Sequence, residues 1–163
     1  MGIDRKSISG MEPLTATQIE QSFSRKDRKR VVLPNLAGIE WGEIDFLSWR
    51  HRDGSKFFVV HNVLDEELHG LILTPSNFIG GTVRQCDWCE TTNSGYKVSL
   101  FTATYVSNPN IKVSKSMCSD LDCSDYVRGK KFPSIATVTP RIGVENRIAR
   151  LKENLDNYFL QIL

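Results

Sequence analysis

The chain has 163 residues, of which 40% are apolar, so it is long enough to bury one hydrophobic core. Its formal net charge of +2 excludes a strong whole-molecule attraction for nucleic acid and leaves room only for local basic surfaces. No apolar stretch approaches the roughly 20 residues that cross a bilayer, and the N-terminus lacks a signal-peptide pattern. We therefore expect a cytoplasmic protein with no membrane partner.

The first predicted element is a short amphipathic helix. Residues 1–13 are predicted to be a flexible tail ahead of a single α+β domain over residues 14–163. Thr15 has the chemistry of an N-cap, and Gln18, three residues later, is its capping-box partner. A helix over about residues 16–24 should follow, with an apolar pair one turn apart that suits docking on a sheet.

A concentrated basic run occupies residues 25–30, where five positive charges accompany one negative charge. Two interpretations remain open for it. The run either contacts phosphate or is a solvated connector between two elements.

Between residues 31 and 73 the pattern changes to β-strands. The segments are rich in β-branched and aromatic residues, and Asp53-Gly54 marks a tight turn. The predicted strands cover residues 31–33, 44–49, 57–60 and 68–73, and Pro75 should end the last of them. An antiparallel β-meander is the simplest connection.

The second half of the chain adds two strands and two helices. The strands are predicted over residues 96–106 and 111–117. A short helix within residues 119–128 would place the last two cysteines at a helix N-terminus, where amides and the dipole favour thiolate. The final helix, over residues 142–163, is the clearest, because its apolar residues recur every three or four positions.

All four cysteines fall in two tight pairs: Cys86 and Cys89 are separated by two residues, Cys118 and Cys123 by four. Such pairs are typical of one tetrahedral zinc site, and a knuckle, strands and then a helix give the element order of a treble clef, here over about residues 82–131. We expect one structural Zn²⁺, because a closed four-sulfur site leaves no position for water or substrate. A disulfide pair, an iron centre or unligated thiols are the alternatives, and a reducing compartment disfavours the disulfides.

Two further interpretations concern chemistry around the cysteines. Trp88, between the first two ligands, either shields the sulfur atoms from water or projects outward as a contact residue. The sequence contains no nucleophile elbow, no phosphate-binding loop and no zinc-protease helix, so we do not expect an enzyme.

Basic and aromatic residues around the metal site suggest a binding surface. The candidates border the cysteines in the sequence: Phe101, Tyr105, Lys112, Lys115, Arg128, Lys130 and Lys131. Gathered on one face, they would suit ribosomal RNA or an acidic protein, whereas scattered exposure would carry no function.

The order of these features resembles a known family. Residues 86–90 read Cys-Asp-Trp-Cys-Glu, a strand follows through residues 98–101, and a lysine-bearing strand enters Met117-Cys118 ahead of the Cys-x4-Cys pair and the terminal helix. This resembles the C-terminal treble-clef domain of the elongation factor G-binding proteins, the FusB-type fusidic acid resistance family. The upstream helix, basic run and strands follow the same order, so about 150 residues are covered.

The resemblance implies a zinc-stabilised, monomeric adaptor that binds elongation factor G and promotes its release from the ribosome, which rescues translation when fusidic acid traps the factor. The family's proteins also carry an N-terminal helical bundle, for which this sequence has no room. The alternative hypothesis is a zinc-containing module that binds RNA or the ribosome through the basic residues.

Overall fold

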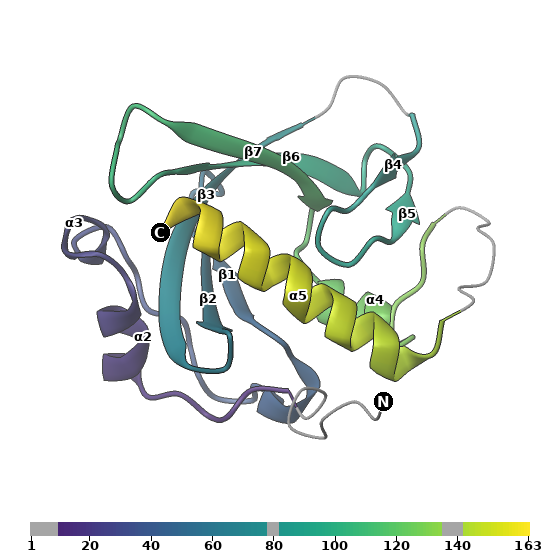
Figure 1. The fold of residues 1–163 in the computed structure, drawn as a ribbon, viewed down its shortest axis with the longest axis horizontal. Helices are drawn as coiled ribbons and strands as arrows, with labels where there is room; N and C mark the ends of the chain where they lie inside the picture. The colour runs from purple at the N-terminus through teal and green to yellow at the C-terminus, as the bar shows by residue number, and fades with distance from the viewer. Residues whose placement is uncertain (1–9, 78–81, 135–141) are drawn as a thin grey trace.

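The computed structural model describes residues 10–77, 82–134 and 142–163 and arranges them as an antiparallel sheet with helices on both faces (Figure 1). The helical elements are α2 (Ala16–Ser22), α3 (Arg25–Arg28), the 3-10 turn η1 (Trp41–Glu43), α4 (Cys123–Val127) and α5 (Val144–Ile162). The strands are β1 (Leu47–Arg50), β2 (Phe57–Val63), β3 (Glu67–Asn77), β4 (Arg84–Gln85), β5 (Thr92–Asn93), β6 (Val98–Thr104) and β7 (Lys112–Cys118). The predicted α+β class, with a short early helix and a long final one, is confirmed.

The large sheet has the strand order β1-β2-β3-β6-β7, and all neighbours are antiparallel. The chain follows the predicted meander, except that the two-stranded β4-β5 hairpin is inserted between β3 and β6. β3 serves two neighbours, because it pairs with β2 up to Leu73 and with β6 from Thr74 onward. Val98 lies opposite Cys118, so the outermost strand of this sheet ends at a cysteine.

Two strand predictions are wrong. Residues 31–33 form no strand in the described chain; instead the Trp49 indole donates a hydrogen bond to the Val32 carbonyl, 2.7 Å away, and Pro34 then restricts the backbone. Pro75 does not end β3, which runs to Asn77. The pairing of β2 with β3 ends at Leu73, so Pro75 has β6 as its one described neighbouring strand. Proline is tolerated there because only one side of the strand requires hydrogen bonds.

Both faces of the sheet are buried, which explains the continuous apolar run in β2. Phe57 and Val59 face α5, whereas Phe58 and Val60 face the N-terminal segment. The α2-side core has five buried members, Ile19, Phe23, Leu47, Phe58 and Val60. The larger α5-side core includes Phe57, Phe101, Met117, Leu151, Leu155 and Phe159.

The capping box predicted for the first helix is present. The Gln18 amide donates to Thr15 Oγ1 and the Thr15 amide donates to Gln18 Oε1. The apolar pair of this helix, Ile19 and Phe23, is fully buried. Phe23 lies directly over Gly70 of β3, where an added Cβ would come within 2.7 Å of the ring. A residue without a side chain therefore lets α2 approach the sheet.

The final helix crosses the opposite face of the sheet and continues past the β4-β5 hairpin (Figure 1). Its buried stripe consists of Ile148, Leu151, Leu155, Tyr158, Phe159 and Ile162. Val144, which continues the apolar repeat toward the start of the helix, is exposed. The buried stripe therefore begins one turn later, at Ile148.

The predicted tail falls partly outside the described residues, which begin at Gly10. Within the described part, the Met11 amide donates to the Trp41 carbonyl at 2.9 Å, and the Met11 side chain packs against the α2-side core. Met11, which the sequence places in the predicted tail, therefore contacts the folded body.

Candidate metal centre

The four cysteine sulfurs converge on one point. All lie within 4.8 Å of one another, with 3.7 Å between the sulfurs of Cys86 and Cys123 and 3.5 Å between those of Cys89 and Cys118. A tetrahedral zinc ion with Zn–S bonds of about 2.3 Å sets its sulfurs about 3.8 Å apart. All four side chains are buried, so the donor number, spacing and chemistry fit one closed zinc site.

Hydrogen bonds within residues 86–90 position the sulfur atoms of Cys86 and Cys89. Cys86 follows β4, and its carbonyl accepts from the Glu90 amide at 2.9 Å, while the Cys89 amide points at the Cys86 sulfur at 3.5 Å. Glu90 completes this knuckle with a left-handed backbone, at φ 59°. Amides directed at sulfur favour its thiolate form, the form that binds metal.

The second pair comes from a strand end and a helix start. Cys118 is the last residue of β7, and Cys123 is the first residue of α4. The prediction that both lie at a helix N-terminus is therefore wrong for Cys118. Leu121 takes a left-handed backbone between them, and its amide donates to the Cys118 carbonyl, which closes the loop.

The buried cluster is electrostatically suited to a cation. Burial raises the pKa of the Cys123 thiol well above its usual value. In contrast, hydrogen bonds from Cys118, and then from Cys123 and Cys86, hold the pKa of Cys89 well below its usual value. The hydrogen bonds thus favour a thiolate at Cys89, whereas four buried thiolates need a divalent cation.

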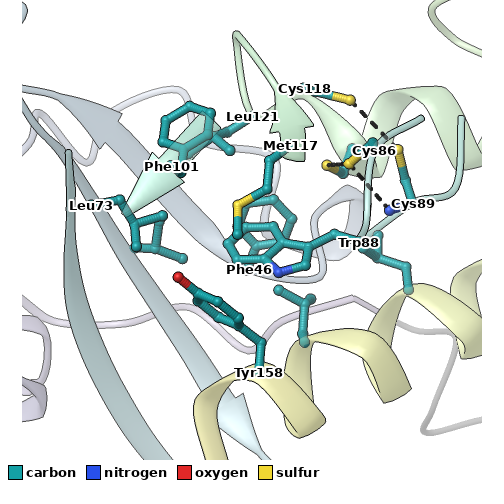
Figure 2. Close-up of a cluster of buried hydrophobic side chains, with 14 of the residues drawn as sticks. Phe46, Leu73, Cys86, Trp88, Cys89, Phe101, Met117, Cys118, Leu121 and Tyr158 are labelled. Atoms are coloured by element: carbon teal, nitrogen blue, oxygen red, sulfur yellow. Dashed lines mark hydrogen bonds between the residues drawn. The ribbon is translucent and has the colours of Figure 1, made fainter. Parts of the chain in front are cut away.

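Trp88 is buried in the α5-side core. Its side chain is 1% exposed and packs edge-on against Phe46 and Tyr158, with ring centroids 5.2 and 5.6 Å away. Figure 2 shows the indole extending from the cysteines toward these two rings. The Trp88 carbonyl also accepts from Asn154 of α5 at 2.9 Å. Outward projection is excluded, and the knuckle is attached to the final helix.

Polar contacts connect the knuckle to β7 within the zinc unit, residues 82–131, and connect this unit to the segment before β1. The Asp87 amide donates to the Ser116 carbonyl, and the Ser116 amide donates back to the Asp87 carboxylate at 2.8 Å. On the other side, Arg128 forms a two-pronged ion pair with buried Asp45 at 2.6 and 3.0 Å, and the Asp45 amide donates to Ser124 of α4. The two elements that lead into the cysteines are thus each held by a polar contact, the knuckle on β7 and α4 on the segment before β1.

The predicted basic face is largely neutralised. Arg128 is engaged by Asp45, and Lys130 donates to Glu43, which raises the lysine pKa. The Lys131 ammonium lies 2.6 Å from Asp120 and 2.8 Å from Asp122, and these hydrogen bonds raise its pKa as well. These three cations stabilise the zinc unit and do not form a free basic face.

The other predicted contact residues divide between core and surface. Phe101 is completely buried in the α5-side core, so its prediction as a surface contact is wrong. Lys112 is exposed and Lys115 half-buried on β7, which lies at an edge of the large sheet. Tyr105 is half-buried, and its hydroxyl accepts from Gln161 at 3.4 Å.

Sequence reasoning missed two exposed aromatic residues, Tyr96 within the zinc unit and Phe132 directly after its end. Tyr96 is 79% exposed and Phe132 is 76% exposed. The segments that carry them are joined, because Ser134 donates to Asn93 and Ser94. The sequence does hold a local signal for exposure, since each of the two aromatic residues is adjacent to a turn-forming residue, Gly95 or Pro133.

Comparison with known proteins identifies the class and then the family. A zinc knuckle, a strand and a short helix that together carry four converging cysteines define a treble-clef zinc-binding protein. Residues 18–162 match the family described as FBP C-terminal treble-clef zinc-finger, and the chain belongs to this family. It binds one structural zinc ion, which Cys86, Cys89, Cys118 and Cys123 would hold.

A solved structure has the same fold. The structure of the fusidic acid resistance protein FusC aligns with a TM-score of 0.61 at 18% sequence identity. The alignment covers 94% of this chain and 60% of FusC. No curated protein sequence matches the chain. None of the helices in the described residues is both long and apolar enough to cross a membrane.

Proposed function

We propose that this protein binds elongation factor G and promotes its release from the ribosome. The observation that carries the proposal is the family match over residues 18–162, which includes the whole zinc unit and both flanking helices. The similarity of the fold to that of a fusidic acid resistance protein supports the same proposal. The expected consequence is protection of translation when fusidic acid holds the factor on the ribosome.

The site suits binding and not catalysis. Four sulfurs complete the coordination of zinc, so no position remains for a reacting water or substrate. The role of the metal is to hold the knuckle, the end of β7 and α4 in one arrangement. A binder of this kind shifts its partner toward the conformation that it binds more tightly.

Tyr96 and Phe132 are the proposed anchors on the partner surface. Large aromatic side chains dominate the energetics of protein interfaces when they enter a pocket on the partner. Both rings are about three-quarters exposed, within or directly after a unit that zinc makes rigid. Lys112, Lys115 and Tyr105 remain candidates for the polar rim, where charge affects the association rate more than the affinity.

Calorimetric titration of purified elongation factor G into this protein tests the proposal. We expect one-to-one binding, as for a monomer, and a loss of affinity of at least tenfold in Tyr96→Ala or Phe132→Ala, since interface anchors cost about 2 kcal/mol or more. Leu160→Ala, which removes a 49% exposed apolar side chain from α5, is the control and should bind normally. An absence of binding heat at several temperatures would contradict the proposed function.

A further inference from the structure

The positive charge of this chain is concentrated in two short segments. Residues 25–30 and 50–56 hold eight of the 21 basic residues and two of the 19 acidic residues. Their formal charge is +6, so the rest of the chain carries −4. The modest net charge therefore conceals a strong asymmetry. We call these two segments together the basic surface.

The fold brings the two segments together at Trp49. Phe23, two residues before the first segment, packs edge-on against the Trp49 ring with centroids 6.2 Å apart. Val32, two residues after it, accepts a hydrogen bond from the Trp49 indole at 2.7 Å. The second segment starts at the next residue, Arg50. Residues on both sides of the segment 25–30 therefore contact Trp49 of β1. This places the segment close to the β1-β2 turn, residues 51–56.

Most cations of the basic surface are unpaired. Among the described residues, five of them have no ion-pair, hydrogen-bond or ring partner: Arg25, Lys26, Lys29, Arg52 and Lys56. Arg28 is different, since it donates to the Phe23 and Gln21 carbonyls and so caps α2. Four of the five unpaired side chains are exposed, and Lys56 is half-buried.

The two acidic residues do not neutralise this surface. Asp53 accepts hydrogen bonds from the amide and hydroxyl of Ser55 within its own turn. Asp27 lies 3.9 Å from Arg30, a long ion pair between a half-buried carboxylate and an exposed guanidinium. This is the opposite of residues 128–131, where every cation has a close carboxylate partner.

We propose that the basic surface binds the phosphodiester backbone of a nucleic acid. Interfaces with nucleic acid are strongly positive, and Arg and Lys supply most of their contacts to phosphate. The centres of protein interfaces are instead depleted of charge, lysine in particular. The zinc unit and the basic surface are then separate sites, the first for elongation factor G, as proposed above, and the second for a nucleic acid.

Fluorescence anisotropy with a labelled 20-base-pair RNA duplex, and with a DNA duplex of the same sequence, tests this proposal. If the five unpaired cations each contact one phosphate, the logarithm of affinity falls against the logarithm of salt with a slope of about −4.5. A rise from 50 to 200 mM salt then weakens binding about 500-fold. Tighter binding of the RNA duplex identifies RNA as the source of the phosphates; equal binding indicates backbone contact alone.

The variant Lys26→Gln, Lys29→Gln, Arg52→Gln removes three of the unpaired cations without breaking a contact. Its salt slope should fall to about −2, since each lost phosphate contact lowers the slope by about one. The matched control Lys97→Gln, Lys112→Gln, Lys115→Gln removes the same charge elsewhere and should keep the original slope. Both variants should retain zinc and the normal melting temperature.

Three results would overturn the proposal. They are an absence of salt-dependent binding in the unmodified protein, an equal loss in the control variant, and competition by polyglutamate as effective as that by unlabelled duplex. The test is independent of the factor-binding proposal, because the basic-surface variant should still bind elongation factor G while Tyr96→Ala should still bind the duplex.

Discussion

Asp45 and Arg128 show how a single buried ion pair joins two parts of this molecule. The Asp45 side chain is fully buried and that of Arg128 is 8% exposed, so neither charge has water as an alternative partner. Eighty-three residues separate them in the sequence, and their contact joins the segment before β1 to the zinc unit. Removing Asp45 would leave the buried Arg128 charge with only the more exposed Glu43, 3.8 Å away, as a carboxylate partner.

Asp45→Ala should lower the free energy of unfolding by about 3–5 kcal/mol. Urea denaturation followed by circular dichroism measures the change. Glu40→Ala, which removes an exposed carboxylate 3.9 Å from Lys130, is the control and should leave the stability nearly unchanged. Equal losses in the two variants would contradict a special role for the buried pair.

Cys118→Ser should abolish stoichiometric zinc binding, because serine does not supply a thiolate ligand at neutral pH. The zinc unit should then lose its cooperative fold, since metal binding free energy at such sites is folding free energy. Elemental analysis gives the zinc content, and a melting curve gives the stability. Ser107→Ala, at an exposed loop position, should change neither. Normal zinc content in Cys118→Ser would refute the ligand assignment.

The residues differ in how well the sequence predicts them. The cysteine ligands were predictable because the spacing within each pair is a local constraint of zinc geometry. Phe101 was not, because whether a residue of β6 faces the core depends on which side α5 covers, a tertiary fact. The same holds for Arg128, whose partner lies in a distant segment.

At the scale of elements, helices with local signals were predicted well and short strands less well. The capping box of α2 and the apolar repeat of α5 are local patterns, which depend only on residues near each other in the sequence. The β4-β5 hairpin has two residues in each strand, too few to produce an alternation, and the cysteines it carries were the only sign of it. The ends of β3 depended on its change of neighbour at Thr74.

The docking of α2 depends on Gly70. Gly70→Ala should destabilise the protein by about 1–3 kcal/mol, because the new methyl group would overlap the Phe23 ring and push α2 away from the sheet. Gly143→Ala is the matched control: no atom lies within 4 Å of the added Cβ, and its φ is not left-handed. Thermal denaturation of the pair measures the difference, and a stable Gly70→Ala protein would show that α2 docks more loosely.

The final helix offers a second matched pair. Leu155→Ala should lower the free energy of unfolding by about 2–5 kcal/mol, because Leu155 lies on the buried face of α5 and its truncation leaves a cavity. Leu160→Ala, on the exposed side of the same helix, should cost much less. Urea midpoints of the two variants give the comparison. Similar midpoints would contradict the assignment of the buried stripe.

At the scale of the whole molecule, zinc connects the N-terminal and C-terminal halves. The knuckle contacts β7 through Asp87 and α5 through Trp88, while α4 contacts the segment before β1 through Arg128. Structural zinc contributes about 10–16 kcal/mol in small zinc-finger peptides, which matches or exceeds the net stability of most domains. Loss of the ion should therefore affect elements far from the cysteines.

Zinc removal with excess EDTA should lower the melting temperature sharply, whereas EDTA already saturated with zinc should have no effect. Acid should act in the same direction. The bound form requires deprotonated thiols, and free thiols take up protons below a pKa of about 8.5, so zinc affinity falls as pH falls. Zinc content after dialysis at pH 7.5 and at pH 5 measures this. Retention of the ion at pH 5 together with an unchanged melting temperature would contradict a thiolate site.

The placement of the two cores along the chain has a consequence for synthesis. Among the described residues, every member of the α2-side core lies between Met11 and Ile72, so this core can be complete before half of the chain has been made. The α5-side core requires residues up to Ile162. During synthesis, the first strands of the sheet should therefore have one face covered by the α2-side core residues, while the apolar residues on the other face are still exposed to solvent. Chaperones would find their binding site there, and premature termination within α5 should yield an aggregating product.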